Sequence, residues 1–235
     1  RPLLLSGLER DAKSLFGTSD ASFGYLILGM LDAINNRKND FNKHFDFISA
    51  PEVLNDASFY RLNGLNRMGY FEDAIVYLKE MFKASKNTND PLLLRALAQL
   101  GMLYGFMEQP GLIIERLNKM TSHNPNQNVG LISLLQLLKN TKIEEAVLVS
   151  VILAGKELLK EKGFQIPTYA FHYSVELDNV IELRMLCFCN NLAKLVEADE
   201  ALSALLIDME DSVDSNLINF NISCRPYNSS HGIGC

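Results

Sequence analysis

Apolar residues recur along most of the chain at the spacing i, i+3, i+4, i+7, which places them on one side of an α-helix. One clear run has apolar residues at Phe23, Leu26, Ile27, Met30, Leu31 and Ile34. No run of β-branched residues alternates with polar ones for long enough to demand a strand, and no Asn-Gly or Asp-Gly turn joins two such runs. The pattern therefore predicts an all-α protein.

Breaks in the pattern divide the chain into helices of about 10 to 18 residues with short connections, which favour antiparallel neighbours. Ser6 and Glu9 form a capping-box pattern for the first helix, and Gly17 ends it. Asp90 and Pro91 predict the start of another helix, because Pro at the first helical position lacks only an N–H that has no intrahelical partner there.

A recurring unit underlies these helices. The second helix of each predicted pair carries a set of three residues, the second four positions after the first and the third three positions further on. The sets are Phe41/Phe45/Ile48, Ala74/Leu78/Met81, Ile113/Leu117/Met120 and Ala146/Ser150/Leu153. Stacked helix hairpins explain why such sets recur along the chain, because each hairpin buries its faces against the next hairpin. An ordinary bundle of evenly spaced amphipathic helices shares the 3.6-residue period and stays the alternative.

Residues 57–90 resemble one pentatricopeptide repeat. The pattern of that family places Gly before a hydrophobic-acidic-acidic-Ala turn and ends the second helix in a Glu-Met pair. The matching residues are Gly69, Glu72, Asp73, Ala74, Leu78, Glu80 and Met81, with Asp90 at the last position of the repeat. The related tetratricopeptide pattern fits less well, because its early aromatic residue and its following Gly correspond to Ser58 and Leu62.

The resemblance implies a right-handed α-solenoid of stacked antiparallel helix hairpins. We expect such repeats over residues 1–165, with the first repeat truncated at the N-terminus. Acidic C-terminal helices are expected over residues 166–215, followed by a loose tail over residues 216–235. Within the acidic segment, helices are predicted from about Thr168 to Glu176, Val180 to Leu195 and Asp199 to Val213, the middle one opened by an Asn179/Glu182 capping box.

Pentatricopeptide proteins bind single-stranded RNA in mitochondria or chloroplasts, reading about one base per repeat from a first-helix residue and the last residue of the repeat. The first-helix position corresponds to Ile27, Tyr60, Gln99 and Ile132. Only Gln99 has the expected amide, and Tyr60 can stack on a base. The resemblance thus implies RNA-binding residues Tyr60, Asp90 and Gln99, and a role in stabilising, processing or translating transcripts in mitochondria, with the cytoplasm as the other compartment.

Charge leaves a second function open. The formal net charge is −6, which argues against a generic polyanion binder. However, residues 1–165 carry 19 Lys and Arg against 18 Asp and Glu, whereas residues 166–235 carry 3 against 10. A nearly neutral solenoid permits RNA binding without favouring it. The alternative is a protein-interaction scaffold that holds a peptide or helix on the concave face of a tetratricopeptide-like solenoid.

No motif predicts a catalytic residue, a metal site or a small-molecule cofactor. The four histidines are scattered outside any HxxxH or HExxH arrangement, and no glycine-rich phosphate loop occurs. The four cysteines lie in the last quarter of the chain, and Cys187-x-Cys189 has the wrong spacing for a CxxC pair. We expect these two cysteines to be small, buried or half-buried residues of a helix in a protein from a reducing compartment.

The remaining motifs have structural interpretations. Glu144 and Glu145 are expected to stabilise the positive end of a helix, and Gly101 and Gly105 to permit close helix packing. No apolar stretch reaches the ~20 residues of a membrane span. The sequence therefore predicts a non-enzymatic binding protein, and an enzyme whose active residues lie outside this chain is the weakest alternative.

Overall fold

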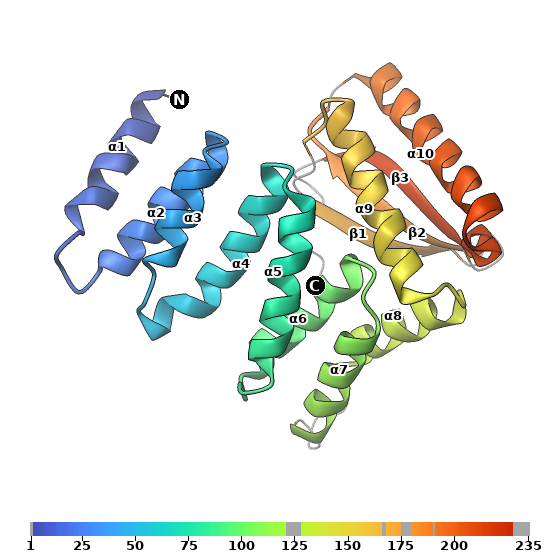
Figure 1. The fold of residues 1–235 in the computed structure, drawn as a ribbon, viewed down its shortest axis with the longest axis horizontal. Helices are drawn as coiled ribbons and strands as arrows, with labels where there is room; N and C mark the ends of the chain where they lie inside the picture. The colour runs from blue at the N-terminus through green and yellow to red at the C-terminus, as the bar shows by residue number, and fades with distance from the viewer. Residues whose placement is uncertain (1, 121–127, 166–167, 175–179, 190, 228–235) are drawn as a thin grey trace. The chain divides into compact units, whose positions relative to one another are not determined.

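The structure is a computed structural model that describes residues 2–120, 128–165, 168–174, 180–189 and 191–227 (Figure 1). Within these ranges the chain forms ten α-helices and three strands, so the helical character of the predicted all-α protein is confirmed, whereas the strands were not predicted. The helices are α1 (Pro2–Ser14), α2 (Ala21–Ile34), α3 (Lys38–Asp46), α4 (Pro51–Arg67), α5 (Phe71–Ser85), α6 (Pro91–Leu103), α7 (Glu108–Met120), α8 (Val129–Asn140), α9 (Glu145–Glu161) and α10 (Leu192–Ser212). The strands are β1 (Thr168–Ser174), β2 (Val180–Cys187) and β3 (Phe220–Pro226).

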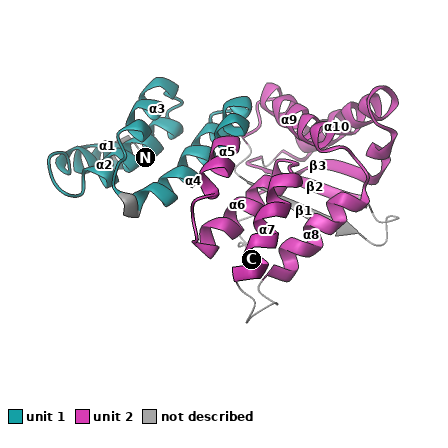
Figure 2. Ribbon diagram, turned by 60° about the horizontal axis from the view of Figure 1, so that its bottom comes forward, with its two compact units in different colours: residues 1–78 teal, residues 79–235 magenta. Residues whose placement is uncertain are grey.

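The chain divides into two compact units, residues 1–78 (unit 1) and residues 79–235 (unit 2), and the division falls inside α5 (Figure 2). In unit 1, α2 packs against α1, α3 and α4. In unit 2, α6 packs against α7 and α8. In each unit, therefore, the first helix of one hairpin contacts the second helix of the same hairpin and the first helix of the next hairpin.

The residue sets predicted to anchor the second helices are buried, in α3 and the residues that follow it and in α5. All six members lie below a tenth exposure: Phe41, Phe45, Ile48, Ala74, Leu78 and Met81. In α7, Ile113 and Leu117 are also buried, whereas Met120 at the helix end is 37% exposed. The predicted hydrophobic period therefore identifies the packed side of these three helices.

The prediction for the fourth set, which lies in α9, is wrong. Ala146 and Ser150 are exposed, and the buried side of α9 includes Leu148, Val151 and Ile152 instead. The reason is the partner that α9 meets. This helix packs against α10 and the sheet, and these neighbours select a different side of the helix from the one that a further hairpin would use.

The sheet has the strand order β1-β2-β3, with β1 antiparallel to β2 and β2 parallel to β3. The crossover between the two parallel strands contains α10 and a short 3₁₀ helix, Ser215–Asn219. Gly155 of α9 lies against Met185, Leu202 and Ile222, so α9 and α10 cover the same face of the sheet (Figure 1). The buried residues of β2 and β3 include Ile181, Leu183, Met185, Cys187, Phe220, Ile222 and Cys224.

These strands correct several predictions for the last third of the chain. The predicted helix from Thr168 to Glu176 is occupied by β1, and β2 replaces the first half of the helix predicted from Val180 to Leu195. Glu182 is in a strand and caps no helix; Asn179 lies outside the described residues. Strand β3 lies inside the segment 216–235 that was expected to be a loose tail. The predicted helix from Asp199 to Val213 is confirmed, since α10 covers it up to Ser212.

The ends of the helices follow the predicted chemistry in α6 but not in α1. Asp90 is the N-cap of α6, where its side chain accepts hydrogen bonds from the N–H groups of Leu92 and Leu93, and Pro91 follows at the first position. The first helix begins at Pro2, so Ser6 lies inside it and caps no helix end. Apolar residues from Leu3 to Leu5 extend the helix beyond the predicted start.

Glu145 connects two helices of unit 2. It lies in the first turn of α9, as predicted, but its Oε2 atom also accepts hydrogen bonds from the backbone N–H groups of Met107 and Glu108, both at 2.6 Å. These groups belong to the start of α7, where backbone N–H groups have no intrahelical acceptor. The carboxylate therefore caps α7 from another helix.

Replacing Glu145 by Ala is expected to destabilise unit 2 by about 1–2 kcal/mol, the usual cost of losing a helix cap. The free energy of unfolding in urea, followed by far-ultraviolet circular dichroism, measures the loss. Glu144 is a matched control, because it is exposed and makes no side-chain cap hydrogen bond. An equal loss in Glu144→Ala and Glu145→Ala would contradict the capping role.

Candidate functional site: an apolar stripe on helix α2

Helix α2 is apolar on nearly all sides. Its sequence, ASFGYLILGMLDAI, contains one Asp, Asp32, no Glu and no basic residue. Four apolar residues follow one another at i, i+4, i+7 and i+11, which places them in one line along the helix. This line, which we call the α2 stripe, consists of Phe23, Ile27, Met30 and Ile34.

The α2 stripe lies at the surface. The exposed fractions are 46% for Phe23, 38% for Met30 and 46% for Ile34. Ile27 is half-buried and packs with Leu5 of α1 against the core. The sequence predicted these residues to share one packed side with Leu26 and Leu31; the structure buries the latter two and leaves most of the stripe outside.

Packing on the other sides holds α2 in place. Gly29 lies so close to α3 that a Cβ atom there would be 2.5 Å from Cε2 of Phe45. On the α1 side, a Cβ atom at Gly24 would be 2.6 Å from the carbonyl oxygen of Ala12. Real Cβ contacts are not this short, so both glycines permit a close approach of the helices. The stripe is thus presented on a helix that is fixed on two other sides.

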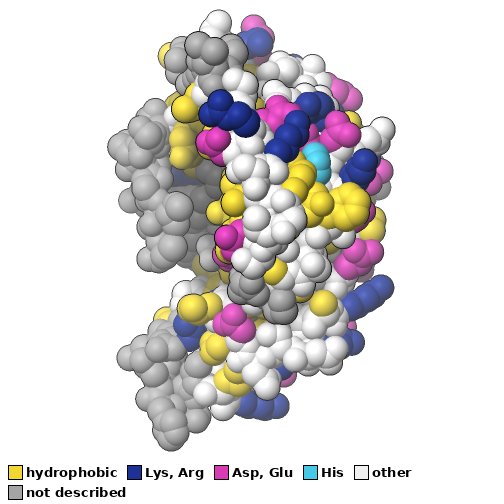
Figure 3. All heavy atoms as spheres, turned by 90° about the vertical axis from the view of Figure 1, so that its left-hand side faces the viewer, with side chains coloured by type: hydrophobic (Ala, Val, Ile, Leu, Met, Phe, Trp, Pro, Cys, Tyr) yellow, Lys and Arg dark blue, Asp and Glu magenta, His cyan; other side chains and the backbone are white. Residues whose placement is uncertain are grey.

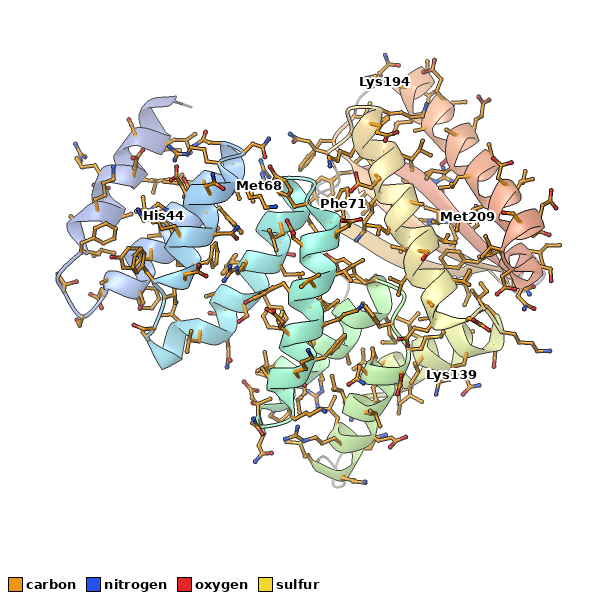
Figure 4. All side chains as sticks on the ribbon, in the orientation of Figure 1. His44, Met68, Phe71, Lys139, Lys194 and Met209 are labelled. Carbon is orange, nitrogen blue, oxygen red and sulfur yellow. The ribbon has the colours of Figure 1, made fainter. Side chains whose placement is uncertain are left out.

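An ion pair and a hydrogen bond on the opposite side of α2 fix the connection to α3. The Asp32 side chain is 1% exposed, and its carboxylate lies 2.7 Å from Nη2 of Arg37 and 2.6 Å from Nδ1 of His44. Figure 4 labels His44 on α3. The backbone N–H of Arg37 also donates to the carbonyl oxygen of Asp32 at 2.9 Å. Because a buried carboxylate needs such partners, the one charged side chain of α2 has a structural role.

Aromatic side chains gather at one end of unit 1. The ring of Tyr25 stacks on Phe16 and Phe47, with centroid distances of 4.6 and 5.1 Å, and lies 6.2 Å from the ring of His44. Figure 3 shows hydrophobic side chains beside the histidine on this face. These rings pack mainly on one another, and they place further apolar surface at the end of α2.

The three predicted RNA-binding residues lie in two units. Tyr60 is on α4 of unit 1 and is 42% exposed. Its neighbour Arg61 is bound to α3 through Asp46, at 2.9 Å. In unit 2, Gln99 is exposed on α6, whereas the carboxylate of Asp90 is engaged in capping the same helix. Tyr60 and Gln99 are therefore accessible side chains, and Asp90 has a structural role.

The surface around the α2 stripe offers shape and apolar area rather than reactive groups. Within the described ranges, no group of three or more His, Cys, Asp or Glu side chains is arranged to hold a metal ion. No helix in those ranges combines the length and the apolar character needed to cross a bilayer. What the stripe can do chemically is to bury apolar side chains of another molecule.

Comparison with models of known protein families, with characterised proteins and with solved structures gives no match to this chain. Its function must therefore be argued from its own residues. The signal that points to the α2 stripe is present in the sequence: a 14-residue helix with a single Asp and no Glu, Lys, Arg or His has more apolar surface than one packed side can bury.

Proposed function

We propose that this protein is a non-enzymatic helical-repeat scaffold that binds an amphipathic helix of a partner protein along the α2 stripe. The observation that carries the proposal is the line of four apolar, mostly exposed side chains on a helix whose one charge is buried on the opposite side. The contacts of α2 with α3 and α4, and of α6 with α7 and α8, support stacked hairpins of a right-handed α-solenoid.

The dimensions of the stripe suit a helical ligand. From Phe23 to Ile34 the helix rises by about 16 Å at 1.5 Å per residue, which is three turns. An amphipathic helix repeats its apolar residues over the same three turns, so the two lines can interdigitate. Covering the exposed halves of Phe23, Met30 and Ile34 contributes on the order of 3 kcal/mol to binding, given about 1.5–3 kcal/mol for complete burial of each side chain.

The proposal predicts that Met30→Glu weakens the binding of a helical ligand by at least about tenfold, because the carboxylate loses its hydration against an apolar partner. The probe is the tightest binder from a library of amphipathic helical peptides selected on the wild-type chain. Its affinity for each variant is measured by fluorescence anisotropy.

Val76→Glu is the matched control, since Val76 is 58% exposed on α5 of the same unit and lies outside the stripe. Its affinity for the peptide is expected to stay within about twofold of wild type. A selection that yields no binder, or a binder that tolerates Met30→Glu, would contradict the proposal.

Single-stranded RNA is the second candidate ligand. Binding it would imply a role in stabilising, processing or translating mitochondrial transcripts. The accessible Tyr60 and Gln99 on first helices favour it, since an aromatic ring stacks on a base and an amide pairs with base edges. Charge disfavours it, because unit 1 has 8 Lys and Arg against 10 Asp and Glu. We therefore expect no affinity for labelled oligouridylate at low salt. Affinity that falls with rising salt and is reduced by Tyr60→Ala would replace the protein ligand by RNA.

A further inference from the structure

Two cysteines that lie 37 positions apart in the sequence meet between strands β2 and β3. The Sγ atoms of Cys187 and Cys224 are 3.3 Å apart, and both residues are buried, at 0% and 2% exposure. Cys187 is the last residue of β2, and Cys224 lies in β3, opposite Met185 in the parallel register. Two thiols in van der Waals contact are the arrangement from which a disulfide forms.

The contacts with Cys187 and Arg225 favour the thiolate form of Cys224. Its backbone N–H donates to Oδ1 of Asp199 at 2.6 Å, and the neighbouring Arg225 pairs with the same carboxylate. The hydrogen bond between the two sulfur atoms holds the pKa of the Cys224 thiol below its ordinary value, and the positive charge of Arg225 adds to this effect, whereas burial and the Asp199 carboxylate oppose it. The same contact raises the pKa of Cys187, so the two thiols are not equivalent.

The residues that directly follow Cys187 reach the surface. Phe188, the next residue after Cys187, is 53% exposed, and Cys189 is half-buried. A small oxidant therefore needs only a local opening at the end of β2 to reach the sulfur atoms.

We propose that Cys187 and Cys224 are an oxidisable dithiol that hydrogen peroxide converts into a disulfide between β2 and β3. In the first step the Cys224 thiolate attacks one peroxide oxygen, the O–O bond breaks and Cys224 sulfenic acid forms; the departing hydroxide takes up the proton that the Cys224 thiol lost on ionisation and leaves as water. In the second step the Cys187 sulfur attacks Cys224, the S–O bond breaks, and a second water leaves. The two thiols lose two electrons and two protons, and peroxide is reduced to two waters.

The disulfide has a defined structural effect. It closes a covalent loop from residue 187 to residue 224, which contains the whole of α10. Edge strand β3 then stays attached to β2 independently of the hydrogen bonds between the strands. This oxidation is separate from ligand binding in unit 1, because both cysteines belong to unit 2.

The test uses the full chain carrying Cys189→Ser and Cys235→Ser, so that Cys187 and Cys224 are its only thiols. After peroxide treatment of the folded protein, the intact mass is expected to fall by about 2 Da, as two hydrogens leave. Trypsin, which cleaves after Arg184 and Lys194, is expected to give the 185–194 peptide joined to the peptide with Cys224. Dithiothreitol should restore the original mass.

A mass increase of about 32 Da from sulfinic acid, or thiols that survive peroxide unchanged, would overturn the proposal. In the same background, Cys187→Ser should stop the 2 Da loss and leave Cys224 to oxidise further. Circular dichroism checks that each variant is folded. In the wild-type chain, the same linked peptide joined through Cys189 instead of Cys187 would also overturn the assignment.

Discussion

Gly105→Ala is expected to destabilise unit 2 by about 3 kcal/mol or more. Gly105 follows the end of α6 with a φ of +87°, a left-handed conformation that costs an L-residue about 1–2 kcal/mol. A Cβ atom there would lie 2.9 Å from the backbone nitrogen of Val149 and 3.0 Å from the carbonyl carbon of Leu148. Because backbone atoms of α9 cannot move aside as a side chain can, relieving this contact costs a further 1–3 kcal/mol or so.

Gly163→Ala separates conformational strain from the steric contact. Gly163 ends α9 with a φ of +77°, and a Cβ atom there would have no neighbour within 4 Å. This substitution is expected to cost only about 1 kcal/mol. Urea unfolding followed by circular dichroism measures both variants. Equal losses at the two glycines would show that the contact between α6 and α9 is not as close as described.

The second large effect is a pH dependence that originates at Lys156 on α9. The side chain is 1% exposed, and its Nζ lies 3.6 Å from the centre of the Tyr104 ring. Burial holds the pKa of this lysine well below its ordinary value, because the charged amine loses its hydration. At each pH between the two pKa values the unfolded chain binds more protons than the folded chain. Stability therefore rises with pH in this window, by up to about 1.4 kcal/mol per pH unit.

Lys156→Met is expected to remove this rise, because the thioether fills a similar volume and does not titrate. The free energy of unfolding, measured in urea between pH 7 and pH 9, gives the slope for each variant. Lys160→Met is the control, since the Lys160 side chain is 47% exposed and pairs with Glu157 at the surface. A Lys156→Met variant that keeps the wild-type slope would contradict the prediction.

The helices of the first 161 residues could be predicted because their packed sides repeat at the helical period. In α3 and α5 the predicted anchors are the buried residues, and the capping chemistry of Asp90 identifies the start of α6. These signals are local, so no knowledge of the partners is needed. The face of α9 was mispredicted because its partner is a sheet, which the local pattern does not reveal.

The strands were missed because local preferences and distant pairing disagree. Strand β2 contains Glu, Leu, Arg and Met, which favour helices in isolation, although Ile181, Leu183 and Met185 alternate with polar residues at the strand period. Pairing with β1 on one side and β3 on the other overrides the helical preference. The contact between the two cysteines was missed for the same reason. Cys187 was expected on a helix, but it lies on a strand and contacts Cys224.

The candidate site was predicted only in part. The sequence pointed to Ile27 and Tyr60 as first-helix positions, and Tyr60 is accessible. It did not show that Met30 and Ile34 are outside, because the same period describes a buried and an exposed apolar side. Only the contacts of α2 with three other helices decide which side is which.

The parallel pairing of β2 with β3 sets an order of events on the ribosome. Residues 188–219 separate the two strands, and at about 5–20 residues per second their synthesis takes roughly 2–6 s. During this interval the β3 side of β2 is an open edge that can pair with other chains. Unit 1 precedes the sheet in the chain, so its synthesis is complete before the sheet forms. The nascent protein thus has a brief period of vulnerability to aggregation, which ends when β3 is added.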